Sequence, residues 1–511
     1  MKTGSYAKTL YYVIPCIIVC AMAWVHWAAG YTFPVPWPDE AVFVHQAISV
    51  QHSNSLVTSY LSESRAILWM PPGYMILLGL IFKIVGSSLF IARLVSFALT
   101  ISILGIIAWM LRNDPARFYL LSLTGLIFLN RFVVILGNTA RMEPLLILGA
   151  VAAMGLFLEK KNNKAIALLF VLFLIHPNAA YFFAAGLVFV FLQRLVLREG
   201  APTDRTDRII IVLVLVLLAA YAVYAGLHWS DFLRDMSYQF MRKSRRNMAA
   251  SLLTPGALVF IGINLAAALV ALARKERGPL LFGIFALFFW LVNKIGQEMW
   301  YQVFDVFAIL FLSIVLIQLL NPARKTILHT LLFLAAVFVN RELNMIESFR
   351  GYPHSLRWFG MAFQTQVDYF NQDDAWKLRN FYLEHQVNHA PIRTKIYPSG
   401  DALLLHASEG ESLKTIYVAT DTSVFPQQQH DLFLVHVSRY SPIGWDSSLL
   451  SWALEDARID TSDKRNLIFE RDGTEQWYYR FAPGFPDSRL GGKRLSLEKN
   501  RDTSDRAQSD R

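Results

Sequence analysis

The chain is poor in cysteine and in charged residues. Only two cysteines, Cys16 and Cys20, occur among its 511 residues, so a disulfide framework is excluded. Their i, i+4 spacing puts both on one helix face, where we expect them to pack as small side chains. Asp, Glu, Lys and Arg make up 17% of the sequence against 55% hydrophobic residues. That balance excludes an ordinary soluble enzyme and is typical of a membrane protein.

Sequence signatures of nucleotide and metal sites are also missing. The chain has no Walker motif, no GxGxxG at a strand–helix junction, no HExxH and no CxxC. Nucleotide chemistry and the common metal sites are therefore not indicated. The net charge of +10 would suit a nucleic acid, but basic residues of membrane proteins collect in cytoplasmic loops and near anionic head groups. We therefore expect membrane lipid, and no nucleic acid, as a partner.

Long apolar runs dominate what is present, and many approach the roughly 20 residues that cross a bilayer. The first run lacks a small-residue cleavage site, so we interpret it as a retained helix rather than a signal peptide. The short stretch 70–87 is treated as re-entrant or surface-lying, because this places nearly every basic loop inside. About eleven spans result, with the N-terminus inside and the C-terminus outside. The expected spans are 9–29, 88–111, 118–137, one ending at Leu158, 164–180, 181–197, 208–228, 255–273, 279–293, 300–320 and 326–340.

The predicted fold is an all-α polytopic membrane domain followed by a soluble α+β domain on the outer side. The membrane domain covers 1–340, with a first outer loop at 30–87 in which 39–52 reads as an amphipathic helix on the membrane surface. Beyond it, apolar runs shorten to strand length, so 341–485 is expected to be the second domain. The tail 486–511 is rich in Ser, Asp, Arg and Lys and is expected to be disordered. The second domain should contain a helix near 374–389 and strands near 415–419, 431–437, 466–470 and 476–481.

Two adjacent carboxylates, Asp39 and Glu40, follow Pro36-Trp37-Pro38 where the chain leaves the first apolar run. An Asp after Pro at a helix start is a common N-cap, and that interpretation stays open. The alternative interpretation is a catalytic role, because a helix N-terminus favours an ionised Asp39. Such a carboxylate can orient or deprotonate an attacking hydroxyl. Asp39 and Glu40 are therefore the candidate catalytic residues.

A second group of candidates lies at the same expected depth. Arg141 and Glu143 are either an interfacial pair that snorkels to the surface, or a site in which Arg141 binds a phosphate and Glu143 serves an acceptor or a metal. His176 precedes Pro177 near the outer end of a span and is either structural or a phosphate ligand. Tyr74 is a further polar candidate on the outer side, associated with the acceptor or a metal.

One expected outer loop breaks the charge rule. Residues 229–254 contain Arg234, Arg242, Lys243, Arg245 and Arg246, although basic loops normally stay inside. Binding to anionic lipid head groups is one interpretation, and a phosphate or anionic-acceptor site that includes Arg246 is the other.

The order of these segments resembles the GT-C superfamily of membrane glycosyltransferases, most closely its aminoarabinose transferase-like and protein O-mannosyltransferase-like families. The resemblance covers about 1–200 by motif and the remainder by layout only. It rests on the Asp-Glu pair of the first outer loop and on Pro71-Pro72-Gly73-Tyr74, Ala92-Arg93-Leu94-Val95-Ser96 and Arg141-Met142-Glu143-Pro144-Leu145-Leu146.

The resemblance implies an inverting transferase that uses a polyprenyl-phosphate-linked sugar on the periplasmic or lumenal face. The acceptor would be a hydroxyl of a glycolipid, a polysaccharide or a protein, and similar bacterial proteins place the chain in the inner membrane. By resemblance Asp39 is the catalytic Asp, with Glu40 beside it. Arg141 and Glu143 match the family's Arg-x-acid segment, and His176 falls near the donor phosphate.

The sequence departs from the family at two places. Aminoarabinose transferases carry Glu-Lys before the proline of the re-entrant stretch, with the Glu a metal ligand, whereas Trp69-Met70 stand here. No cofactor is therefore assigned, and a divalent metal ion is left open. The Arg-Tyr at the start of a late helix is replaced by Trp300-Tyr301.

Two other classes of function compete with this interpretation. A transporter or flippase would carry ionisable residues near the bilayer midplane and show repeated halves. The candidates here cluster at one interface and no repeat is visible, which favours an enzyme. A non-catalytic subunit of cell-surface polysaccharide assembly with the same fold also stays open.

Overall fold

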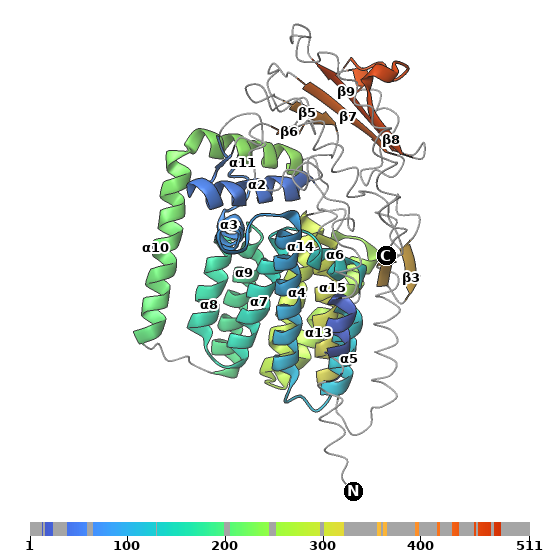
Figure 1. Cartoon of the computed structure of the whole chain (residues 1–511). Coiled ribbons are helices and arrows are strands. Elements are labelled where there is room, and N and C mark those ends of the chain that lie inside the picture. Colours follow the sequence, from blue (N-terminus) through green and yellow to red (C-terminus); the bar gives the residue numbers. More distant parts are fainter. Residues whose placement is uncertain are drawn as a thin grey trace.

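A computed structural model describes most of the first 320 residues and short parts of the remainder. Its membrane part is a bundle of upright helices, with α2, α3 and α11 lying across one end (Figure 1). The described residues are 13, 16–23, 38–58, 65–128, 130–198, 205–244, 252–296, 301–320, 355–358, 361–364, 394–397, 416–418, 432–438, 454–455, 458–471 and 475–481.

The described bundle contains 6 helices that are long and apolar enough to cross a membrane, together with shorter apolar helices. This composition, in the arrangement of Figure 1, identifies an integral membrane protein. The helices are α4 (Leu89–Leu111), α5 (Arg117–Phe128), α6 (Arg131–Gly137), α7 (Glu143–Leu158), α8 (Asn162–Val171) with a 3-10 turn at Leu172–Leu174, α9 (Ala179–Leu192) with a π turn at Gln193–Leu197, α10 (Arg205–Leu227), α13 (Pro255–Ala273), α14 (Arg277–Gly296) and α15 (Gln302–Leu319).

Most expected spans coincide with these helices, but the continuous helix expected over 118–137 is wrong. The chain forms α5 and α6 instead, with Asn130 capping α6. Asn130 has an extended backbone, and its side-chain oxygen accepts a hydrogen bond from the N–H of Phe132 at 2.8 Å. A polar cap that satisfies a free backbone donor starts a new helix here, at the Asn130-Arg131 dipeptide between two apolar runs. The expected span 326–340 lies outside the described residues.

The stretch predicted to be re-entrant or surface-lying forms α3 (Gly73–Val85), which is too short to span and lies across the bundle end (Figure 1). It packs against α2 (Pro38–Ser53). A Cβ added at Gly79 of α3 would lie 2.6 Å from Val50 Cβ and 2.8 Å from the Ala47 carbonyl oxygen. The two helices thus approach closely because position 79 has no side chain.

Helix α2 is not the amphipathic surface helix that the sequence suggested. Its buried side chains include Val42, Phe43, Val44, Gln46 and Ala47, which occupy more than one side of the helix. Gln46 donates a hydrogen bond to the Ile67 carbonyl at 3.0 Å, next to the short β1 (Val57–Thr58) and β2 (Arg65–Ala66) pair. α2 is therefore enclosed by the rest of the first outer segment.

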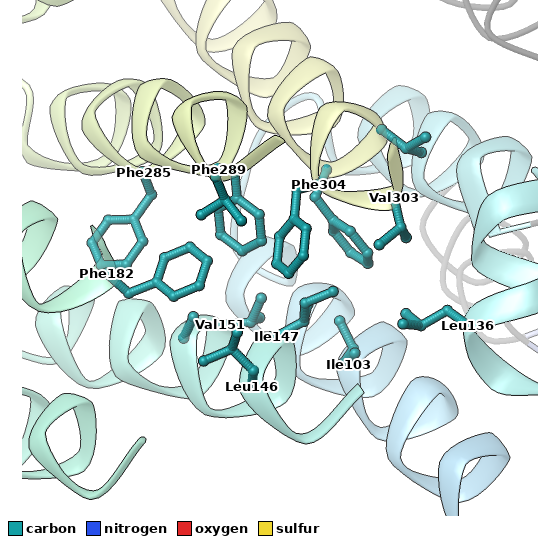
Figure 2. Close-up of a cluster of buried hydrophobic side chains, with 14 of the residues drawn as sticks. Ile103, Leu136, Leu146, Ile147, Val151, Phe182, Phe285, Phe289, Val303 and Phe304 are labelled. Carbon is teal, nitrogen blue, oxygen red and sulfur yellow. The ribbon is translucent and has the colours of Figure 1, made fainter. Parts of the chain in front are cut away.

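The bundle core is aromatic and lies below this layer. Figure 2 shows Phe182 of α9, Phe289 of α14 and Phe304 of α15 turned toward Ile147 and neighbours on α7. The Phe182 and Phe289 ring centroids are 4.6 Å apart, and those of Phe289 and Phe304 are 6.0 Å apart. Lipid tails are as apolar as these side chains, so the hydrophobic effect does not drive helices together in a bilayer. Close van der Waals packing of this kind holds them together instead.

Helices α10 and α11 (Trp229–Ser244) form an arm at one side of the bundle (Figure 1). Only 11% of the apolar window in α10 is buried. α11 begins two residues after α10 ends and crosses the bundle end beside α2 (Figure 1). The first part of the expected basic loop 229–254 is therefore a helix.

Beyond 340, the structure describes β3 (Ser355–Trp358) and β4 (Met361–Gln364), which pair with each other, and a 5-stranded mixed sheet. β6, β5 and β7 are parallel, whereas β9 is antiparallel to both β7 and β8. All four expected strands are confirmed, and the expected helix 374–389 lies outside the described residues. The sheet order is β6 (Ile416–Val418), β5 (Thr394–Tyr397), β7 (Leu432–Ser438), β9 (Glu475–Phe481) and β8 (Leu467–Arg471).

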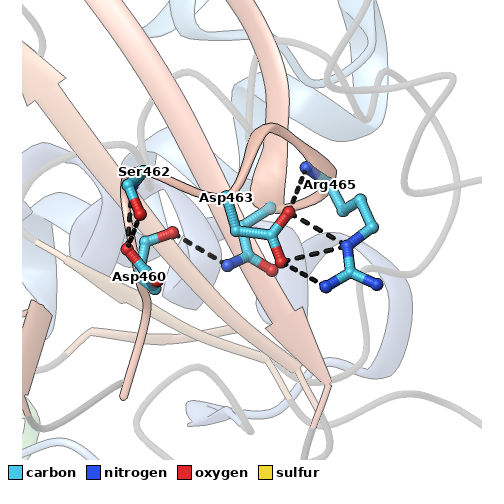
Figure 3. Close-up of polar contacts among 5 residues, drawn as sticks. Asp460, Ser462, Asp463 and Arg465 are labelled. Atoms are coloured by element: carbon cyan, nitrogen blue, oxygen red, sulfur yellow. Dashed lines mark hydrogen bonds and ion pairs between the residues drawn. The ribbon is translucent and has the colours of Figure 1, made fainter.

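The turn that leads into β8 is built by short polar side chains (Figure 3). Asp460 accepts hydrogen bonds from Ser462, and Asp463 accepts one from the backbone N–H of Arg465 at 3.0 Å. The Arg465 guanidinium then folds back onto the Asp463 carboxylate at 2.7 Å. Such Asx turns fix a strand start locally.

Candidate active site

A buried ion pair joins α2 to α4. Both oxygens of Glu40 accept from the Arg93 guanidinium, at 3.1 Å from Nε and 3.2 Å from Nη2, and both side chains are buried. Burial raises the pKa of the Glu40 carboxyl above its ordinary value, while the Arg93 charge, its hydrogen bonds and the Ala140 backbone N–H oppose the rise. Charge-assisted bidentate contacts of this kind are strong and geometrically specific.

A second buried pair, Arg141 with Glu143, lies at the start of α7. Arg141 Nη2 is 2.8 Å from Glu143 Oε1, and Arg141 Nε is 3.1 Å from Oε2. Glu143 is the first residue of α7, where the helix dipole stabilises a carboxylate, and Pro144 suits the first helical turn. The Arg141 guanidinium also lies 5.8 Å from the ring centroid of Phe43 on α2. The pair therefore faces the same part of the molecule as Glu40.

Tyr74 of α3 contacts α4 three residues after Arg93. Its hydroxyl is 3.4 Å from the Ser96 hydroxyl of α4, and the side chain is fully buried. Burial raises the pKa of the Tyr74 hydroxyl above its ordinary value, and the charges of Glu40, Glu143 and Arg141 also act on it. Tyr74 therefore remains a neutral hydrogen-bonding group of this cluster.

His176 occupies the break between the 3-10 turn after α8 and the start of α9. Its Nδ1 accepts a hydrogen bond from the Asn178 backbone N–H at 2.9 Å, so a neutral ring carries its proton on Nε2. Nε2 lies 3.3 Å from the hydroxyl of Tyr301, which directly precedes α15. Since His176 also acts electrostatically on Glu143, it belongs to the same cluster.

These contacts bring together five of the predicted site residues. Glu40, Tyr74, Arg141, Glu143 and His176 all lie at the α2 end of the bundle and are buried. Asp39 is the second residue of α2, and its side chain lies outside the described part of the structure. Arg246 also falls outside the described residues.

The sequence reasoning missed three residues of this region. Arg93 and Ser96 belong to the motif at 92–96, but no role was predicted for them. A charged residue inside an apolar span is itself a signal of a functional site. Asp305 of α15 was not considered, yet it accepts hydrogen bonds from Asn293 at 2.6 Å and from Lys294 at 2.8 Å. Each of the three was hidden in a run of apolar neighbours.

The residues where the family would hold a metal do not fit one. Trp69 stacks on Phe43 with ring centroids 5.8 Å apart, and Met70 is buried. Both Glu143 oxygens contact Arg141. Among the described residues, no three His, Cys, Asp or Glu side chains are grouped as a metal site. We therefore derive no step through a metal ion.

Comparison with known structures identifies the fold of the chain. No family profile and no curated protein match the sequence. The crystal structure of ArnT from Cupriavidus metallidurans bound to undecaprenyl phosphate superposes with a TM-score of 0.56. The match covers 92% of this chain and 98% of that chain, at 12% identity. The chain has the fold of ArnT.

The apo state of ArnT gives the same result, with a TM-score of 0.52 over 94% of this chain and 99% of that chain, again at 12% identity. The polytopic helical architecture expected from the motifs is thus confirmed as an ArnT-like fold. Both matches cover nearly the full length of ArnT.

Proposed function

We propose that this chain is an inverting membrane glycosyltransferase. It moves a sugar from a polyprenyl-phosphate donor to a hydroxyl of a glycolipid, polysaccharide or protein, on the periplasmic face of a bacterial inner membrane. The observation that carries the proposal is the fold of ArnT, which has been crystallised with undecaprenyl phosphate. The buried cluster at the α2 end supplies a suitable site.

Donor binding is assigned to Arg141. A guanidinium fork matches a phosphate as well as a carboxylate, so a phosphodiester can share or take the place of Glu143 on Arg141. His176, whose ring is oriented by Asn178 and Tyr301, lies near enough to donate from Nε2. These donors stabilise the charge that develops on the phosphate as it leaves.

Acceptor activation is assigned to Asp39. The acceptor oxygen attacks the anomeric carbon, and the carbon–oxygen bond to the phosphate breaks with its electron pair staying on the phosphate. The hydroxyl proton passes to the Asp39 carboxylate. Attack from the face opposite the leaving group inverts the anomeric centre. Polyprenyl phosphate is a good leaving group, so an Asp with an ordinary pKa suffices as base.

Sugar transfer in isolated membranes tests the proposal. Radiolabelled undecaprenyl-phosphate sugars are supplied to membranes that hold equal amounts of the unaltered chain, Asp39→Asn or the control Glu159→Gln. Glu159 is partly exposed and pairs with Lys161 after α7, at the other end of the bundle. We expect label in an acceptor fraction with the unaltered chain and the control, and loss of about a hundredfold or more with Asp39→Asn.

The other outcomes have distinct meanings. Transfer that survives in Asp39→Asn would refute the role of Asp39 but not the transferase. If no donor is consumed by any chain, a transporter or a non-catalytic assembly subunit of the same fold replaces the transferase.

A further inference from the structure

Helix α11 carries a line of large apolar side chains that remain exposed in the structure. Trp229, Leu233 and Phe240 are 56%, 45% and 76% exposed, respectively. Each residue of an α-helix turns the chain by about 100°, so these three positions lie within about 40° of one another around the helix. They form one continuous face, which we call the apolar stripe.

The other two sides of α11 differ from the stripe, since one is buried against protein and one is polar. Asp235 is buried, and its carboxylate accepts a hydrogen bond from the Leu68 N–H at 2.7 Å. Arg234 is exposed and pairs with Asp231 at 3.3 Å. By the same helical periodicity, Asp235 and Arg234 each lie about 100–160° from the apolar stripe, on opposite sides of it. The helix therefore has a protein face, a polar face and an apolar face.

The level of α11 relative to a bilayer follows from the preceding helix. α10 contains an apolar segment of 22 residues, Thr206–Leu227, that is long enough to cross a membrane, and only 11% of its apolar window is buried. Such a helix is about 33 Å long, close to the hydrocarbon thickness of about 30 Å. α11 begins two residues later and runs across the bundle end (Figure 1). It therefore starts at the level of the lipid head groups and lies along the membrane surface.

We propose that the apolar stripe of α11 docks into the lipid leaflet at the α2 end of the bundle. Interfacial helices insert apolar and aromatic side chains at the boundary between head groups and acyl chains, while their polar side stays in water. Trp229 stands at the head-group level that tryptophan favours. Leu227, the last residue of α10, is 78% exposed, so the lipid-facing surface of α10 continues into the stripe. This docking is independent of the proposed transferase activity.

The protein face of α11 gives the docking a structural consequence. Leu68 lies five residues before Gly73, the first residue of α3, and Asp235 holds its backbone N–H. A lipid-docked α11 therefore anchors the segment before α3 to the membrane surface through one buried hydrogen bond. For the helical part of the basic segment 229–254, the partner is then lipid rather than an anionic acceptor.

Nitroxide labels on the full chain in lipid nanodiscs test the docking. In a background whose two cysteines are replaced by Ser, single labels are attached at Leu233→Cys and Phe240→Cys in the stripe. Arg234→Cys, directly beside Leu233, is the matched control for the polar face, and Val216→Cys is the reference for an exposed position of α10. Collision rates with oxygen, which partitions into lipid, and with a water-soluble nickel chelate report the surroundings of each label without any need for activity.

We expect both stripe labels to have an oxygen-to-chelate collision ratio several-fold above that of Arg234→Cys and close to that of Val216→Cys. Thermal midpoints show that each labelled chain is folded, and the two stripe positions, both exposed, report independently. A chelate collision rate at the stripe equal to that of Arg234→Cys would overturn the docking. Low collision with both reagents would also overturn it, and spin–spin broadening would then assign the stripe to a second copy of the chain.

The anchoring of Leu68 is tested by charges placed on α11. The double variant Leu233→Asp with Phe240→Asp should release the stripe from lipid and speed hydrogen exchange at Leu68 several-fold in nanodiscs. The control, Ser230→Asp with Ser237→Asp, adds the same charge at exposed serines of the helix and should leave Leu68 unchanged. Equal exchange at Leu68 in the two double variants would refute the anchor.

Discussion

The hydroxyl of Tyr301 lies 3.3 Å from Nε2 of His176, and their rings meet edge to face with centroids 5.9 Å apart. The two residues are 125 positions apart, and each stands next to a helix start. The contact therefore joins the α8–α9 break to the beginning of α15.

Removing that hydroxyl should weaken transfer without unfolding the protein. In Tyr301→Phe the ring still packs, but Nε2 loses a hydrogen-bond partner worth about 1 kcal/mol, so kcat/KM should fall about fivefold. Initial rates at low donor concentration measure the effect. Tyr181→Phe, at a half-buried residue of α9, serves as the control, and an equal fall there would indicate a general packing effect.

The close approach of α2 and α3 predicts a pair of opposite outcomes for two glycines. Gly79→Ala places a Cβ against Val50 and the Ala47 carbonyl, so it should destabilise the fold by about 1–3 kcal/mol. Gly105→Ala in α4 meets nothing within 4 Å and should not lower stability, since alanine favours a helix. Thermal midpoints in the same detergent compare the two. A Gly79→Ala midpoint equal to that of Gly105→Ala would contradict the packing.

His45 in α2 predicts a loss of stability in acid. Burial lowers the pKa of its imidazole from 6.5 to about 3. Below about pH 6.5 the unfolded chain binds a proton that the folded chain does not, so stability falls by up to about 1.4 kcal/mol per pH unit until the folded pKa is reached. His45→Gln should remove this part of the pH dependence.

The measurement is the thermal midpoint of the unaltered chain and of His45→Gln between about pH 7 and about pH 4. Taking the difference between the two chains cancels the other titrating groups. His52→Gln removes an exposed imidazole from the end of the same helix and is the control. Parallel curves for the unaltered chain and His45→Gln would show that His45 is not buried in the neutral form.

Asp235 ties the arm to the segment that leads to Tyr74. Its buried carboxylate accepts a hydrogen bond from the Leu68 N–H at 2.7 Å. Asp235→Ala should therefore speed hydrogen exchange at Leu68 by about tenfold, because charge-assisted bonds contribute about 1.5–3 kcal/mol. Asp231→Ala on the same helix, which removes a partly exposed pair with Arg234, should leave Leu68 unchanged. Equal exchange in the two variants would argue against the tie.

The sequence predicts the regular parts of this fold well. Thr254 and Pro255 provide a cap and a first residue ahead of an apolar run, and α13 spans the predicted residues. The strand near 476–481 is likewise found as β9. The cap at Asn130 was missed because two polar residues, Asn130 and Arg131, were treated as compatible with a continuous span, and only the backbone geometry shows that Asn130 caps a new helix.

The pairings within the cluster were predictable only where the residues are close in the chain. Arg141 and Glu143 are two positions apart at a helix start, so their pairing follows from local geometry. Glu40 and Arg93 meet only after α2 folds back over α4, and nothing in their spacing predicts it. The enclosure of α2 was missed for the same reason, since α3, which packs on it, follows only after an intervening segment of the chain.

The exposure of α10 determines which amino-acid substitutions this helix tolerates. Only 11% of the apolar window in α10 is buried, whereas 72% of the apolar window in α15 is buried. Exchanges among Leu, Ile, Val and Phe should therefore be tolerated at most positions of α10, apart from the buried Val214 and Ala225. In a complete substitution library, α10 should be defined by length and apolarity alone, while α15 should accept few replacements at all.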